Sequence, residues 1–122
     1  MRTTILAIPL LLALGCNSSS NSGGDSPFAS RYDAANAIQI TNERDAAFAK
    51  LAVDAGEAGD GDIVKKCIKA IQVVNTKDDA AYNAALKLAK SGNGPAATEV
   101  AKLIQITTKR DAALSKIAKG DY

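Results

Sequence analysis

Apolar side chains in the second half of the chain recur at the three- and four-residue spacing of one helix face. Two segments show this pattern at matching places, and they carry Val64, Cys67, Ile68 and Ile71, then Ala97, Val100, Ala101 and Ile104. An earlier segment keeps Ala34, Ala35 and Ile38 but has Arg31 at the leading place. The spacing therefore predicts a short helix in each of the three segments, with the first the least apolar.

The chain repeats itself with a period of about 33 residues, which is typical of stacked helical units. Ile38-Gln39-Ile40 recurs as Ile71-Gln72-Val73 and as Ile104-Gln105-Ile106. A second shared element follows each copy, at residues 44–48, 78–82 and 110–114. Aligning this element on its paired small residues places one extra residue in the middle copy. That alignment puts Phe48, Tyr82 and Leu114 at the same place in a second, longer helix of each repeat.

Polar residues at the expected helix ends support this division. Asn42, Thr76 and Thr108 precede the longer helices, and Asp45, Asp79 and Asp111 follow them by three residues, as in a capping box. Glycine-rich stretches at residues 56–62 and 91–95 end two of the helices, with Asp60 or Asp62 suited to capping the next helix and Pro95 to a first turn.

Together these signals predict an all-α fold in residues 28–122, a short α-solenoid of about three helical hairpins. The stack resembles the tetratricopeptide class of helical-hairpin repeats in its period and its two-helix unit, although the Trp-Leu-Gly-Tyr signature of that class is absent. The resemblance implies peptide or protein binding on a concave helix face.

Residues 1–15 have the pattern of a signal peptide, with Arg2, an apolar run of about ten residues and a small residue before the break. The run is shorter than the roughly 20 apolar residues that cross a bilayer. Residues 16–27 then form a Ser/Asn/Gly-rich tether.

The Leu12-Ala13-Leu14-Gly15-Cys16 junction resembles the lipobox of bacterial lipoproteins. The resemblance extends from Met1 to Cys16 and implies a covalent diacylglycerol on Cys16 and a lipid-anchored place in the cell envelope. Asn17 after the cysteine favours the outer membrane by analogy with that family. Ala13 stands where the family usually has Leu, and Ala13-Leu14-Gly15 also fits ordinary secretory cleavage, so a secreted or periplasmic protein is the alternative.

Composition narrows the functional classes. The 122 residues include 24 alanines and no tryptophan or histidine, with a net charge of +2 that becomes +1 without the leader. Because positive and negative charges nearly balance, we expect no electrostatic attraction to nucleic acid. Without histidine, and with no nucleophile–base pair or metal-ligand spacing, we expect no catalytic residue, no metal and no cofactor beyond the lipid on Cys16.

Four groups of residues are candidates for a specific role. Gln39, Gln72 and Gln105 are a repeated amide ladder, serving either the packing of helix ends or a binding strip. Leu114 and Ile117 are expected to form an exposed end interface. Cys67 is expected to be a buried thiol, with a disulfide to an unlipidated Cys16 as the alternative. The acids Asp54, Glu57, Asp60 and Asp62 match no calcium loop in their spacing.

The sequence therefore favours a membrane-anchored helical-repeat module that binds an unidentified envelope protein or itself. A structural or spacer lipoprotein without a specific ligand, and a secreted soluble helical regulator, are the alternatives. They differ in whether any exposed surface of the stack is selective.

Overall fold

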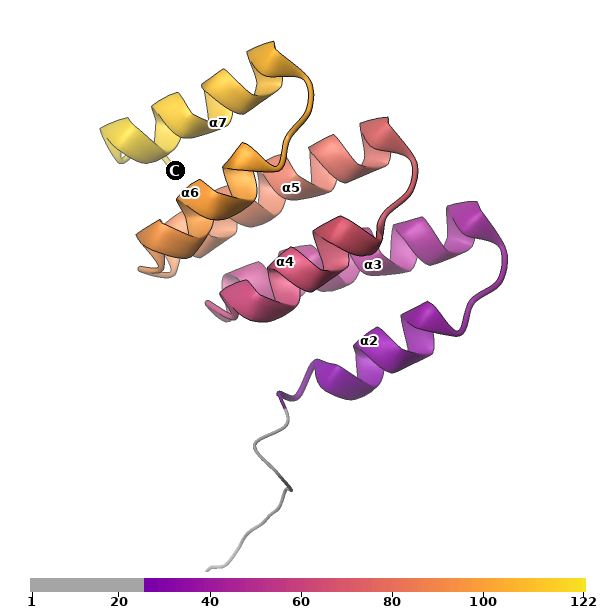
Figure 1. The fold of residues 1–122 in the computed structure, drawn as a ribbon. Helices are drawn as coiled ribbons and strands as arrows, with labels where there is room; N and C mark the ends of the chain where they lie inside the picture. Colours follow the sequence, from indigo (N-terminus) through magenta and orange to yellow (C-terminus); the bar gives the residue numbers. More distant parts are fainter. Residues whose placement is uncertain (1–25) are drawn as a thin grey trace, which may run out of the picture.

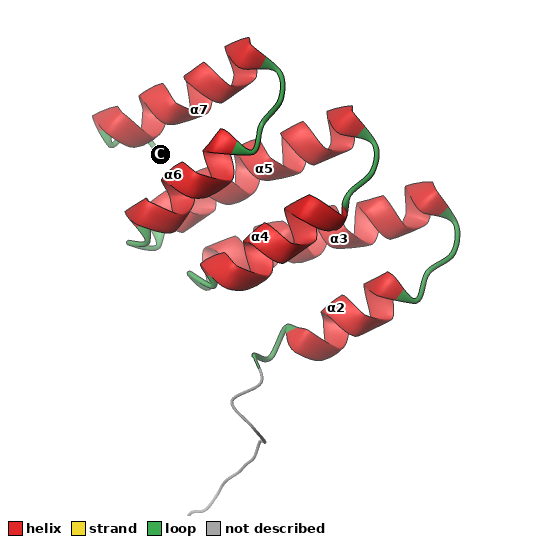
Figure 2. Ribbon diagram, in the orientation of Figure 1, coloured by secondary structure: helices red, strands yellow, loops and turns green. Residues whose placement is uncertain are grey.

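The computed structural model describes residues 26–122, and all regular structure in this range is helical (Figure 2). Six helices follow one another along the chain: α2 (Ala29–Asn36), α3 (Thr41–Glu57), α4 (Gly61–Ala70), α5 (Val74–Lys90), α6 (Gly94–Lys102) and α7 (Thr107–Lys119). The predicted all-α stack of helical pairs is confirmed. Within the described range, no helix has the length and apolar character needed to cross a bilayer.

The helices form two layers (Figure 1). The longer helices α3, α5 and α7 pack side by side in one layer, and the shorter helices α2, α4 and α6 lie in the other. The three loops that contain an Ile-Gln pair all lie along one edge of the stack, while the loops that join α3 to α4 and α5 to α6 lie along the opposite edge. Any residue that recurs once per repeat is therefore displayed in a row.

The repeat keeps one constant spacing throughout, because the longer helices begin at Thr41, Val74 and Thr107, at equal intervals along the chain. The predicted extra residue in the middle copy is wrong. At the constant spacing Ala81, and not Tyr82, occupies the place of Phe48, and Ala81 is fully buried whereas Tyr82 is half-buried. The alignment on the paired alanines, Ala46-Ala47 with Ala80-Ala81, is therefore shifted by one position in the middle repeat.

The predicted capping boxes are also wrong. The longer helices have Ile40, Val73 and Ile106 at their N-caps, and none of these residues makes a side-chain capping bond. Asn42 lies inside α3, and Asp45 is the fifth residue of that helix. A carboxylate at this position cannot accept hydrogen bonds from the amides of the first turn of its own helix. It accepts them from the following repeat instead.

The loops at the opposite edge follow the sequence signals closely. Asp60 caps α4 by accepting a hydrogen bond from the Ile63 amide, and Asn93 caps α6 in the same way. Pro95 lies in the first turn of α6, as expected. Each loop also contains a glycine with positive φ, Gly59 (80°) and Gly92 (96°), a conformation that side chains with a Cβ disfavour.

Small residues let the longer helices approach closely. The core contains many alanines, and a Cβ added to Gly56 of α3 would lie 2.9 Å from the backbone oxygen of Ala84 in α5. Larger side chains fill the space between the layers, among them Phe48, Leu51 and Ile68, each at most 1% exposed. The alanine-rich composition thus serves close helix packing as well as helix propensity.

Two glycines one repeat apart provide a test of this packing. Gly61 is buried, and a Cβ added there would lie 2.5 Å from the Cβ of Ala96, whereas a Cβ on Gly94 would meet nothing within 4 Å. We expect Gly61→Ala to lower the free energy of unfolding by about 2 kcal/mol through overpacking. Gly94→Ala should change it by no more than about 0.5 kcal/mol. Urea unfolding followed by far-ultraviolet circular dichroism measures both, and equal midpoints would contradict the packing.

Candidate interaction surfaces

Two buried aspartates join neighbouring repeats. Asp45 of α3 is 1% exposed, and its carboxylate accepts hydrogen bonds from the backbone amides of Gln72 (3.1 Å) and Val73 (2.9 Å). Asp78 of α5 is 0% exposed and accepts from the amides of Gln105 (3.0 Å) and Ile106 (2.9 Å). Each aspartate thus fixes the Ile-Gln loop of the following repeat.

These carboxylates also lie at the start of the next longer helix. Val73 is the N-cap residue of α5 and Ile106 that of α7, so Asp45 and Asp78 place negative charge where the helix dipole is positive. Charge-assisted hydrogen bonds of this kind are stronger than neutral ones. Each of these two helix starts is therefore stabilised by the preceding repeat and not by a capping residue of its own.

The three Ile-Gln loops hold aliphatic side chains out in solvent. Ile40 is 67% exposed, Val73 38%, Val74 43% and Ile106 40%. Ile40, Val73 and Ile106 lie at corresponding places in the three loops, and Val74 follows Val73 as the first residue of α5. The three loops line one edge of the stack in Figure 1. We call this row, together with the adjacent glutamines, the loop edge. A row of exposed aliphatic residues on a rigid support is typical of an interaction surface.

The three predicted glutamines lie on this loop edge. Gln39, Gln72 and Gln105 are all exposed and occupy the loops between paired helices. Their backbone amides differ, because those of Gln72 and Gln105 are bound by Asp45 and Asp78. Each glutamine directly precedes an exposed aliphatic residue of the row. Binding through the three glutamine side chains stays a prediction.

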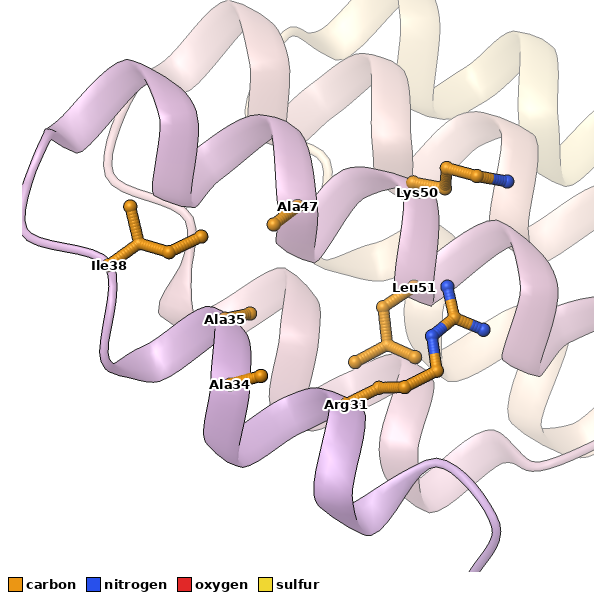
Figure 3. Close-up of a pocket in the computed structure, with 7 residues that line it drawn as sticks. All are labelled: Arg31, Ala34, Ala35, Ile38, Ala47, Lys50 and Leu51. Carbon is orange, nitrogen blue, oxygen red and sulfur yellow. The ribbon is translucent and has the colours of Figure 1, made fainter.

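The two ends of the stack are less well covered than its middle. Leu114 and Ile117 in α7, predicted as an end interface, are both half-buried. At the other end, α2 and α3 enclose an open pocket of about 320 Å³. Figure 3 shows the side chains that line it: Arg31, Ala34, Ala35, Ile38, Ala47, Lys50 and Leu51.

Cys67 is fully buried in α4, as predicted, and has no disulfide partner among residues 26–122. Burial raises the pKa of its thiol to about 12, and nearby Lys66 and Arg31 oppose that rise only in part. Cys16, the predicted lipidation site, lies outside the described residues, as do the predicted signal peptide and most of the tether.

The raised pKa predicts that Cys67 reacts slowly with iodoacetamide in the native protein, because the thiolate is the reactive form. In urea the thiol should react at the rate of an ordinary exposed cysteine. Mass spectrometry of the peptide that contains Cys67 separates its signal from that of Cys16. Rapid native labelling at neutral pH would contradict the buried position.

The acidic residues near the first hairpin serve structural contacts. Asp54 pairs with Arg31 (2.8 Å) and with Lys50 (3.4 Å). The hydrogen bond from Arg31 holds the pKa of Asp54 below its usual value, desolvation opposes it, and Lys50 adds to the lowering. Asp60 caps α4 and accepts a hydrogen bond from Ser26. No three acidic or thiol side chains in residues 26–122 lie close enough together to hold a metal ion.

Sequence reasoning missed the roles of Asp45 and Asp78 and the exposure of the aliphatic residue after each glutamine. The signal was present, because Asp45, Asp78 and Asp111 follow one another at the constant repeat spacing. Asp79 lies next to Asp78, and the predicted alignment paired Asp79, instead of Asp78, with Asp45 and Asp111. Asp79 is in fact exposed and pairs with Lys109.

Comparisons of the chain with protein-family models, with curated proteins and with solved structures found no match. The functional proposal therefore rests on the surfaces and the sequence of this chain alone.

Proposed function

We propose that the chain is an exported lipoprotein, anchored through Cys16, whose helical-repeat domain presents the loop edge to a protein of the cell envelope. The observation that carries the interaction role is the row formed by Ile40, Val73 and Ile106, one exposed aliphatic residue in the loop of every repeat, with the exposed Val74 beside Val73. Isolated exposed apolar residues are common, but a row repeated at one register in successive loops exposes apolar surface that a partner would cover.

The rigidity of two of the three loops supports this role. The amides of Val73 and Ile106 are bound by buried carboxylates, so these side chains are held in place before any partner arrives. A preorganised surface loses less conformational entropy on binding than a mobile one. The glutamine beside each aliphatic residue supplies an amide for hydrogen bonds at the rim.

The N-terminal sequence supports the anchor. The junction before Cys16 has the lipobox pattern, and residues 17–27 are polar and rich in Ser, Asn and Gly. Acyl chains contribute about 0.8 kcal/mol per buried CH₂, so two or more chains give stable attachment. A tether of this composition lets the folded domain stand away from the bilayer. The proposal assigns the chain no catalytic activity.

Site-specific photocross-linking in cells tests the interaction role. We expect a photoreactive residue at Ile106 to give one discrete covalent adduct with an envelope protein. The same residue at Lys90, which is exposed at the opposite edge, should give none. The same diffuse background at both positions would favour a spacer role without a specific ligand.

Cell fractionation tests the anchor with a matched pair of cysteines. Cys16→Ala should release the chain from the membrane fraction, whereas Cys67→Ala should leave it there, because Cys67 is buried in the folded domain. Equal distribution of both variants and the parent chain would contradict lipid anchoring through Cys16.

A further inference from the structure

Within the stack, each repeat contacts the next through the same two features. One is the hydrogen bonding of Asp45 or Asp78 to the loop amides of the following repeat. The other is a face of the longer helix that is completely buried in the stack, where α3 packs against α4 and α5, and α5 against α6 and α7. The residues of that face, all 0% exposed, are Phe48 and Ala52 in α3 and Ala81 and Ala85 in α5.

The C-terminal end of the stack carries the same features without a cover. Asp111, Leu114 and Ala118 of α7 lie one repeat after Asp78, Ala81 and Ala85. Asp111 and Ala118 are exposed and Leu114 is half-buried. A carboxylate and an apolar face that are buried in both earlier repeats are thus presented to solvent.

The N-terminal end carries the matching surface. The stripe of Val64, Cys67 and Ile68 on α4, with Ile71 directly after the helix, is buried, and so is the equivalent stripe at α6. At the same places the first repeat has Arg31, Ala34, Ala35 and Ile38, of which only Ala35 is buried. These four residues line the open pocket in Figure 3, whose small alanine side chains leave room for a side chain of the size of Leu114.

The hydrogen-bond donors at this end are also in place. The amides of Gln72 and Val73 donate to Asp45, and those of Gln105 and Ile106 donate to Asp78. The equivalent amides of Gln39 and Ile40 make no hydrogen bond within residues 26–122. One end of the stack therefore has the acceptor of the repeat interface, and the other end has its two donors.

We propose that the C-terminal end of one copy binds the N-terminal end of a second copy, so that the repeat continues from chain to chain. The Asp111 carboxylate accepts from the amides of Gln39 and Ile40, and α7 covers the α2 pocket with Leu114 and Ala118. The interface is a continuation of the two interfaces already formed inside the chain. Because the two surfaces differ, the contact is head-to-tail, and repeating it adds further copies to the stack.

This inference goes beyond the proposed function, since it concerns the ends of the stack and leaves the loop edge free. The competing occupant of the pocket is the segment that precedes α2 in the same chain, which lies outside the described residues. If that segment filled the pocket, a second copy could not bind there. Cross-linking between copies distinguishes these two occupants.

Cysteine cross-linking in cells that express the full chain tests the contact. Asp79 and Lys109 form an ion pair between repeats, and Ala112 and Glu43 occupy the same two places at the free ends. Both are exposed, and neither belongs to the proposed hydrogen bonds. A chain with Glu43→Cys and Ala112→Cys, treated with a short thiol-to-thiol cross-linker, should give a ladder of dimers, trimers and longer species on a denaturing gel.

The controls use the same chain. Glu43→Cys combined with Lys90→Cys places the second thiol at the opposite edge and should give no ladder. Adding Asp111→Asn to the reactive pair should weaken the ladder at least about tenfold, because two charge-assisted bonds are lost. Adding Asp79→Asn removes one negative charge at an exposed position away from the free ends, so the ladder should be nearly unchanged.

Absence of the ladder from the reactive pair, or a ladder insensitive to Asp111→Asn, would overturn the proposal. Membrane fractionation of the same cells keeps the two proposals apart. Anchored chains without a ladder would leave the proposed function standing, and a ladder in soluble chains would leave the head-to-tail contact standing without the anchor.

Discussion

Replacing Asp78 by alanine is expected to lower the free energy of unfolding by about 3 kcal/mol, because two backbone amides then lose a buried, charged acceptor. The carboxylate is 0% exposed and binds the amides of Gln105 and Ile106 at 3.0 and 2.9 Å. The loss also removes the negative charge at the start of α7. Urea unfolding followed by far-ultraviolet circular dichroism measures the change.

The neighbouring residue provides a matched control. Asp79 is exposed and forms a surface ion pair with Lys109, so Asp79→Ala should cost no more than about 1 kcal/mol. Asp111→Ala, in the same register as Asp78 but exposed, should cost about 0.5 kcal/mol or less in dilute protein. A larger loss for Asp79→Ala than for Asp78→Ala would show that the uninterrupted register of the repeat is wrong.

Phe48→Ala is expected to lower the free energy of unfolding by about 4 kcal/mol, through lost burial and the cavity that the ring leaves. Phe48 is 0% exposed, and its ring centroid lies 5.2 Å from that of Tyr32 in α2. The ring therefore joins the first short helix to the rest of the stack. The same unfolding measurement applies, and hydrogen exchange in α2 should rise in the variant.

Leu114→Ala is the control for this substitution. Leu114 occupies the place of Phe48 in the last repeat but is half-buried, so its loss should cost about 1 kcal/mol. Equal effects of Phe48→Ala and Leu114→Ala would mean that the end of the stack is covered in the isolated chain, against the partial exposure of Leu114.

The sequence predicted the parts of the fold that depend on local signals. The apolar spacing identified the short helices, and the glycine-rich stretches identified the loops that join successive hairpins, with Asp60 or Asp62 as the expected cap of α4; the cap is Asp60. The repeated Ile-Gln pair identified the period. Each of these signals lies within a few residues of the structure it specifies, so no knowledge of neighbouring repeats is needed to read it.

The contacts between repeats could not be read in the same way. Asp45 looks like a capping residue because it is acidic and close to a helix start, and only the packing of the next repeat shows that it binds the amides of Gln72 and Val73. Tyr82 looks like the equivalent of Phe48 because each follows a pair of alanines, whereas the buried place holds Ala81. In both cases the local sequence suggested one position, and the constant spacing of the repeat required another.

Display of this stack of helices at the cell envelope depends on the proposed lipid anchor. The mass of the N-terminal peptide, taken from membrane-fractionated protein, tests this anchor. We expect a peptide that begins at Cys16 and carries acyl chains, with the Cys16→Ala chain recovered in the soluble fraction. An unmodified Cys16 in soluble protein would contradict the anchor and make the chain a secreted helical-repeat protein.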